Sequence, residues 1–281
     1  MTFPDRKYKK ITCTGKIYFP MMVFFVLLFF SCSEELHLAK QFVADRDTIN
    51  ILLLKTDVII KKNMKINADE LPANKRDSLA LAESVILKNL VDTTFVNLLF
   101  SGLTDGMNKK KFRVFLEERV DTFLLVHPAA YIFYLAQMEI EESTVNYTDS
   151  AMYDSTMYYQ QFDLNSIDLN LWYELSEQNG DQKTSKVLFS SASASDQIDG
   201  YFHKAFFELP KYYYTRKDIT ISDIYLLTSS FGNDNAGYIY DFFMNDYIYK
   251  NYKGNKKPKY LHYNSQTGKI YPSGYHRFIF M

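Results

Sequence analysis

The feature that most constrains the fold of this chain is an uninterrupted apolar run at residues 17–30. Four lysines precede the run, and polar sequence begins directly after Cys32. A basic start, a short apolar middle and a small residue before the cleavage point are typical of a secretory signal peptide. We therefore expect residues 1–31 to be removed. The part that must fold then runs from Cys32 to Met281 and contains 250 residues.

The length of the apolar run separates a signal peptide from a membrane-spanning helix. Its 14 residues would rise about 21 Å as a helix, whereas the hydrocarbon core of a bilayer is about 30 Å thick. The pair Ser31-Cys32 resembles the lipobox of bacterial lipoproteins, which implies a lipid on Cys32. Phe29 and Phe30 stand where leucine and a small residue are usual, and this relaxed pattern is similar to that of Bacteroidetes-type lipoproteins. An uncleaved N-terminal anchor and cleavage without lipid are the alternatives.

The same resemblance implies a place in the cell envelope, with the lipid in the outer membrane. One acyl chain gives only marginal, reversible membrane binding, but a lipoprotein cysteine usually carries more than one. The acidic pair Glu34-Glu35 partly resembles the signal that sends some Bacteroidetes lipoproteins to the outer face of that membrane. The periplasmic face and the cell surface both stay open, and the sequence does not determine the oligomeric state.

Composition excludes several classes of function. The full chain has a formal charge of −1, and removing residues 1–31 leaves about −5, because that segment holds five basic residues and one aspartate. No basic stripe remains, so nucleic acid is not an expected partner. The chain contains only two cysteines, Cys13 and Cys32. The part after the signal peptide therefore has no disulfide, thiol nucleophile or cysteine metal site, and packing must stabilise it.

Hydrophobic patterning in the first half predicts a strand, a helix and a second strand. Residues 48–54 form a continuous apolar stretch typical of a strand buried on both faces. Residues 76–90 repeat apolar side chains at helical spacing, and residues 112–116 predict the second strand. This order implies a right-handed crossover between two parallel strands. The remaining segments are expected to be a tether at residues 32–47, a polar loop at 61–75, and a helix at 93–103 that stops near Gly102 and Gly106.

The second half predicts an antiparallel meander followed by a helix. Strands are expected at residues 131–142, 158–175 and 186–192. The apolar alternation changes phase between Leu164 and Ile167, which predicts a bulge there. The later segments are an aromatic stretch at 201–214, a helix at 222–249 with Ser222 as its N-cap and a break at 232–235, a basic loop at 253–259, and a short strand or packed tail at the end.

We therefore expect one mixed α/β (α+β) domain over residues 48–281, with a mixed sheet, a helical crossover, an antiparallel meander and a C-terminal helix. This element order resembles that of envelope lipoproteins such as the penicillin-binding-protein activators and the curli secretion lipoprotein. Residues 49–54 and 240–245 resemble segments of uncharacterised Bacteroidetes lipoproteins. Neither resemblance implies a catalytic residue, and likeness of fold alone does not transfer function.

The polar residues offer no catalytic signature. Asp57 follows the first strand, where ligands often bind in parallel sheets, but no glycine-rich turn follows it, so a turn or helix-cap role is expected. Glu139 and Glu141 would lie about 6.6 Å apart on one strand face and, with Glu142, form the densest carboxylate cluster. That pair suits acid/base work on a sugar, but a solvated strand face is the favoured interpretation.

The histidines and serines follow no known site pattern. No pair among the five histidines has helical metal-ligand spacing, and no Gly-x-Ser-x-Gly elbow surrounds the serines of residues 190–195. We therefore expect no metal, no cofactor and no catalytic residue. His203, which stands among aromatic residues, is expected to be simply packed. The histidines considered are His37, His127, His203, His262 and His276.

Aromatic residues provide the remaining hypothesis. Tyr212, Tyr213 and Tyr214 form a run that suits a partner surface, because tyrosine combines contact area with a polar group. The expected function is that of a non-enzymatic, membrane-anchored envelope lipoprotein that engages another envelope protein. A surface glycan-binding or glycan-hydrolysing lipoprotein and a structural envelope component are the alternatives.

Overall fold

The computed structural model describes residues 33–56, 58–66, 76–126, 130–178, 185–273 and 278–280. The signal-peptide segment and Cys32 lie outside the described residues, as do Asp57, His127 and His276. The predicted cleavage and lipid attachment therefore stay predictions. Within the described part of the chain, no helix combines the length and the apolar character that crossing a membrane requires.

The core of the fold is a seven-stranded sheet with the order β11-β6-β5-β4-β1-β3, in which β2 pairs with part of β4. Strand β1 runs parallel to β3 and β4, whereas β4, β5 and β6 form an antiparallel meander. These pairings confirm the mixed α+β fold, its crossover and its meander. The strands are β1 (Asn50–Leu54), β2 (Ile59–Asn63), β3 (Arg113–Phe115), β4 (Ala130–Tyr153), β5 (Thr156–Glu177), β6 (Lys186–Ser195) and β11 (Ile279–Phe280).

Strand β1 is buried on both faces, as its continuous apolar sequence predicts. Ile51 and Leu53 join the main core under the long helices. Leu52 points to the other face and packs with Phe115 and Phe123, which lies on α5 (Val120–Leu124). Neither face of this strand is exposed to water, so no position favours a polar side chain. This explains the unbroken run Ile-Leu-Leu-Leu.

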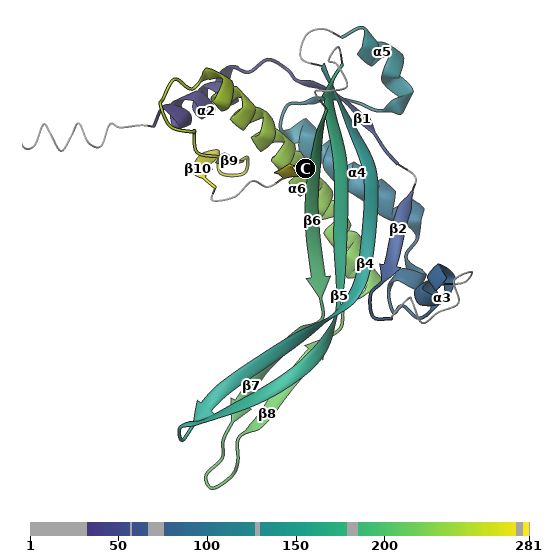
Figure 1. Ribbon diagram of the computed structural model, residues 1–281, viewed down its shortest axis with the longest axis vertical. Coiled ribbons are helices and arrows are strands. Elements are labelled where there is room, and N and C mark those ends of the chain that lie inside the picture. The colour runs from purple at the N-terminus through teal and green to yellow at the C-terminus, as the bar shows by residue number, and fades with distance from the viewer. Residues whose placement is uncertain are drawn as a thin grey trace, which may run out of the picture.

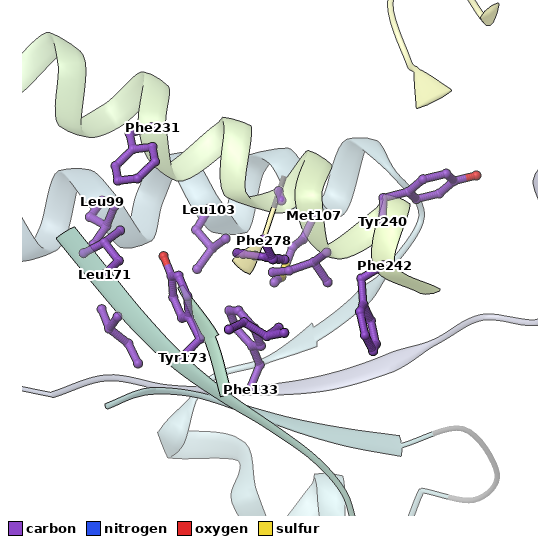
Figure 2. Close-up of a cluster of buried hydrophobic side chains, with 14 of the residues drawn as sticks. Leu99, Leu103, Met107, Phe133, Leu171, Tyr173, Phe231, Tyr240, Phe242 and Phe278 are labelled. Atoms are coloured by element: carbon purple, nitrogen blue, oxygen red, sulfur yellow. The ribbon is translucent and has the colours of Figure 1, made fainter. Parts of the chain in front are cut away.

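Two long helices cover one face of the sheet, α4 (Asp92–Lys109) and α6 (Ile221–Asn251). Figure 2 shows Leu99, Leu103 and Met107 of α4 meeting Phe133 and Tyr173 of the sheet. The N-cap of α6 is Thr220 instead of the expected Ser222. The Thr220 side chain accepts a hydrogen bond from the Asp223 backbone, and the Asp223 carboxylate accepts one from the Thr220 backbone, which completes a capping box.

Both helices pass through glycines that the sequence predicted to end or break them. A Cβ added to Gly102 would lie 2.1 Å from the Ser229 carbonyl oxygen, and one added to Gly232 would lie 2.2 Å from the Leu99 carbonyl oxygen. The glycines therefore let the backbones of α4 and α6 touch where the helices cross. The predicted stop near Gly102 and Gly106 and the predicted break at residues 232–235 are wrong, because contact between helices decides the role of these glycines.

The predicted tether is also wrong, because residues 34–45 form helix α2 (Glu34–Asp45). The Ser33 hydroxyl caps it by accepting a hydrogen bond from the Leu36 backbone at 3.4 Å. Leu38, Ala39 and Phe42 are buried, and the Phe42 ring lies 5.6 Å from the Tyr240 ring of α6. Three apolar residues on one helical face are enough to dock a short, otherwise polar helix.

The predicted loop at residues 61–75 and the predicted helix at 76–90 also differ from the structure. Part of the loop is strand β2, whose mixed sequence Ile-Ile-Lys-Lys-Asn carries only a weak strand signal. The helix α3 (Arg76–Ala82) is short, and a 3₁₀ turn, η2 (Leu87–Asn89), follows it. The remaining elements are the turn η3 (Glu117–Arg119) and the hairpins β7 (Gln197–His203) with β8 (Lys211–Lys217) and β9 (Leu261–Asn264) with β10 (Lys269–Pro272).

Candidate interaction arm

The hairpin β4–β5 extends well beyond the sheet that contains its first half. Strands β1, β2 and β6 pair with it only as far as Glu142 and Ser166. From the pair Thr144 and Asn165 onward, β4 and β5 continue as a two-stranded ribbon for ten residues each, up to the pair Tyr153 and Thr156, a length of about 33 Å. The hairpin β7–β8 lies along this ribbon (Figure 1). We call residues 144–165 and 197–217 together the arm, and the rest of the described fold the body.

The change of alternation in β5 marks the point where the arm leaves the body. Ile167, Leu169 and Leu171 are buried against the helices, whereas Leu164 and Phe162 point to the opposite face, which β7–β8 covers. The pairing of β5 with β4 continues through this point without a shift, and the pairing with β6 shows no shift up to its last pair at Ser166. The predicted bulge is therefore wrong. The irregularity of this hairpin lies in β4, between Leu135 and Gln137.

Aromatic side chains fill the space between the two hairpins of the arm. The Phe162 ring lies 4.7 Å from the Tyr214 ring and 5.7 Å from the Tyr212 ring. The Tyr212 hydroxyl donates a hydrogen bond to the Asp149 carboxylate at 2.8 Å. Partial burial and this hydrogen bond raise the pKa of Tyr212 to about 12, so the phenol stays protonated. Tyr153 donates another bond across the interface, to the carbonyl of Phe202 at 2.8 Å.

The three predicted partner residues do not share one face. Tyr212 and Tyr214 point between the hairpins, because side chains alternate along a strand. Tyr213 points outward, where its ring stacks on Tyr201 at 6.0 Å and His203 contacts it at 6.3 Å. Of the predicted run, only Tyr213 lies on the outer face of β8.

A buried carboxylate joins the arm to the body. Asp196, between β6 and β7, accepts hydrogen bonds from the backbone of Asn165 and of Ile219, each at 2.9 Å. It also receives the Arg216 guanidinium at 2.6 Å. Burial alone would raise the pKa of Asp196, but these donors outweigh it and hold the pKa below its usual value. We call Asn165, Asp196 and Arg216 the elbow; a cleft of ≈ 650 Å³ lies beside it.

The carboxylate cluster of β4 has a structural role. Glu142 is fully buried and receives Lys65 at 2.6 Å and the backbone N–H groups of Val85, Ile86 and Leu87 at 2.8–3.1 Å. Burial opposes ionisation of Glu142, yet these donors hold its pKa below the usual value. The Lys65 ammonium also reaches the Asn165 side chain at 2.5 Å, which links this cluster to the elbow.

Glu139 and Glu141 share one lysine. The Lys62 ammonium lies 2.6 Å from the Glu139 carboxylate and 3.3 Å from that of Glu141. The two carboxylates are therefore held by an ion pair on the sheet surface. Neither residue lines a described cavity.

The end of the arm carries the two most exposed large apolar side chains of the described fold, Phe206 and Phe207. In the β7–β8 loop, Phe206, Phe207 and Leu209 are 88%, 95% and 75% exposed. Phe207 also has a φ of +67°, a conformation that bulky residues rarely adopt. The β4–β5 turn adds two exposed methionines, Met152 and Met157. We call these five residues the tip. None of these five residues was predicted as part of a partner surface, although two adjacent phenylalanines shortly before Pro210 are an unusual signal in the sequence.

The other polar candidates do not form a site. Within the described parts of the chain, no three metal-binding side chains cluster. His262 pairs with the buried Asp241, whose other carboxylate oxygen accepts the Tyr263 backbone N–H at 2.9 Å. Ser190 donates to Asn235 at 2.6 Å in the core, and His37 is exposed on α2.

Comparisons with known proteins supply no relative from which a function could be transferred. A scan against models of known protein families finds no match, and a search of curated proteins finds no similar sequence.

Proposed function

We propose that this protein is a non-enzymatic, lipid-anchored envelope protein that holds another envelope protein with the tip of its arm. The observation that carries the proposal is the exposure of Phe206, Phe207 and Leu209 at the end of a braced projection. Monomeric proteins seldom leave contiguous large apolar side chains in water unless they mark an interaction site. Aromatic anchors that enter a partner's pocket typically contribute most of the binding energy of an interface.

The construction of the arm supports the same proposal. Ordered hydrogen bonds of Asp196 and Tyr212 hold the two hairpins together, so the tip is presented without a large loss of conformational entropy on binding. The predicted anchor would leave the chain next to α2, which Figure 1 places away from the tip along the longest axis. An anchored body would then present the tip at a distance from its own membrane.

Photocrosslinking in intact cells tests this function. With the full-length protein and a photoreactive side chain at Phe207, we expect discrete crosslinked products that are absent when the same group replaces Leu226, an exposed residue of α6. A crosslinker at Tyr159 on the outer face of the arm should lose the same products when Phe206 and Phe207 become alanine. Equal products from Phe207 and Leu226, or products that survive the double substitution, would contradict the proposal.

The predicted lipid on Cys32 needs its own test. Cys32→Ala should abolish incorporation of labelled fatty acid and release the protein from membranes. Retention of the substituted protein in membranes would instead support an uncleaved N-terminal helix. Mass spectrometry of the mature amino terminus separates cleavage without lipid from lipid attachment.

Glycan binding is the second candidate, and the stacked rings of Tyr201 and Tyr213 favour it, because they form an exposed aromatic face. Tyr213→Ala should then remove binding to a glycan array and leave the tip crosslinks in place. A purely structural envelope component would show neither binding.

A further inference from the structure

The loop that follows α6 is the most basic segment of the described chain. Residues 250–260 contain five lysines and no acidic residue. Lys250 pairs with Asp246 at 2.7 Å. Within the described residues, the remaining four have no ion-pair partner, and all four are exposed: Lys253, Lys256, Lys257 and Lys259.

This loop lies beside the first described helix. The Lys253 backbone N–H donates to the Glu34 carboxylate at 3.1 Å. Loss of water around the Tyr252 phenol, and then the nearby carboxylates of Glu35 and Glu34, raise the pKa of that phenol. Figure 1 shows the yellow-green loop after α6 beside α2. Cys32 is two residues from Glu34 in the sequence, so the backbone position that would carry a lipid lies within about 7 Å of that residue.

An apolar cavity of ≈ 420 Å³ opens beneath the same lysines. Phe242, Ile248 and Pro258 contribute its apolar lining, and Lys257 and Lys259 stand at its edge with Lys186. Tyr249 also lines it and is 66% exposed. Lysines around an apolar floor with an exposed tyrosine are typical of surfaces that lie against lipid headgroups.

The charges around the cavity are not balanced. Asp246 is shared by Lys186 and Lys250, and the acidic pair at the start of α2 lies at a helix N-terminus, where the helix dipole offsets negative charge. The four exposed lysines are therefore the uncompensated charges of this face. An anionic membrane surface can neutralise several such charges along one loop at once.

From this arrangement we propose that the lysines of residues 253–259 bind the phosphate-bearing headgroups of an anionic membrane surface. The orientation of the protein in this proposal rests on the proposed lipid at Cys32. One acyl chain becomes a stable anchor when a basic patch adds to it. Each lysine near an anionic surface raises the association constant about fivefold.

Protection from an amine-reactive reagent tests the proposal on the full-length, lipidated chain. The protein is placed in nanodiscs of neutral phosphatidylcholine or of phosphatidylcholine with about one third phosphatidylglycerol, and the labelling of each lysine is read by mass spectrometry. We expect labelling of Lys256, Lys257 and Lys259 to fall about fivefold on the anionic discs. Lys55, Lys88 and Lys217, which are exposed elsewhere, serve as internal controls and should not change.

Two further conditions distinguish a membrane surface from a small anion as the cause of any protection. High salt should restore labelling on anionic discs, because it screens the charges, and inorganic phosphate at matched ionic strength should give no protection on neutral discs. Protection by phosphate alone would indicate a small-anion site and overturn the proposal. Equal labelling on both kinds of disc would also overturn it. Failure of the lipid anchor appears separately, as protein that does not float with either disc.

Discussion

At the residue scale, two buried carboxylates connect parts of the fold that are distant in sequence. Glu142 ties β4 to the turn at residues 85–87, and Asp196 ties the arm to the start of α6. Each stays charged because several donors replace the water it has lost. Carboxylates placed in this way are positioned for structure, since both oxygens of each accept hydrogen bonds from groups of the protein itself.

Removing the charge of Asp196 should therefore loosen the elbow. Asp196→Asn replaces an acceptor of four hydrogen bonds by a neutral amide, and we expect a loss of about 2 kcal/mol in the free energy of unfolding, measured by urea denaturation. Asp218→Asn is the control, because Asp218 contacts the same Arg216 but is exposed, and it should cost less than about 1 kcal/mol. Equal effects of the two substitutions would contradict the assigned role.

Acid should weaken the fold through the same two groups. The pKa values of Glu142 and Asp196 are lower in the folded state than in ordinary carboxyls, so their stabilisation is complete above the unfolded values of about 4.3 and 3.9. It is lost as the pH falls through the lower folded values. Urea denaturation between pH 7 and pH 3 should show the free energy of unfolding declining below about pH 4. The double variant Glu142→Gln, Asp196→Asn should decline less steeply, and an unchanged slope would contradict the assignment.

At the element scale, the crossing of α4 and α6 depends on the absence of side chains. Gly102 and Gly232 each face the backbone of the other helix, so the interface is closer than larger residues allow. Gly102→Ala would place a methyl group 2.1 Å from the Ser229 carbonyl oxygen and should lower the free energy of unfolding by about 1–3 kcal/mol.

A matched control for this substitution exists on α6. A Cβ at Gly237 meets nothing nearer than the Lys110 side chain at 3.8 Å. Gly237→Ala should therefore raise the free energy of unfolding by up to about 1 kcal/mol, because alanine favours a helix more than glycine does. Thermal or urea denaturation distinguishes the two variants. Destabilisation by both would mean that helix geometry, and not the contact, is responsible.

At the scale of the whole molecule, the arm and the body have separate cores. The arm is held by rings between two ribbons, whereas the body buries its side chains between the sheet and α4 and α6 (Figure 2). Regions with few buried contacts open more readily than the main core. The arm should therefore be able to lose its packing while the body remains folded.

Phe162→Ala tests this independence. The ring is half-buried between Tyr212 and Tyr214, so we expect a local loss of about 1–2 kcal/mol. Hydrogen exchange should become faster at residues 144–165 and 197–217 and stay unchanged at residues 50–54. Faster exchange throughout the chain would show that the arm and the body unfold together.

The sequence alone was enough for features that follow from local pattern. The continuous apolar run of β1 predicted a strand buried on both faces, and the parallel crossover to β3 and the meander β4–β5–β6 followed from element order. These predictions are confirmed because burial of one or both faces of an element determines the spacing of its apolar residues along the sequence. The aromatic stretch at residues 201–214 also indicated that this segment is unusual.

Only the tertiary structure decided what those residues contact. Gly102 and Gly232 have the sequence signature of helix ends, yet the approach of a second helix gives them their role. The phase change between Leu164 and Ile167 arises because the helices cover one face of β5 in the body, whereas β7–β8 covers the opposite face in the arm. The hydrophobic pattern of the sequence looks the same in this case as it does at a bulge. The Tyr212–Asp149 bond spans 63 residues of chain, the Ile86–Glu142 bond spans 56, and the bonds to Asp196 span 20–31. Such distant contacts leave no local pattern. Whether a side chain is buried depends on how all the elements pack together, so only the tertiary structure shows it.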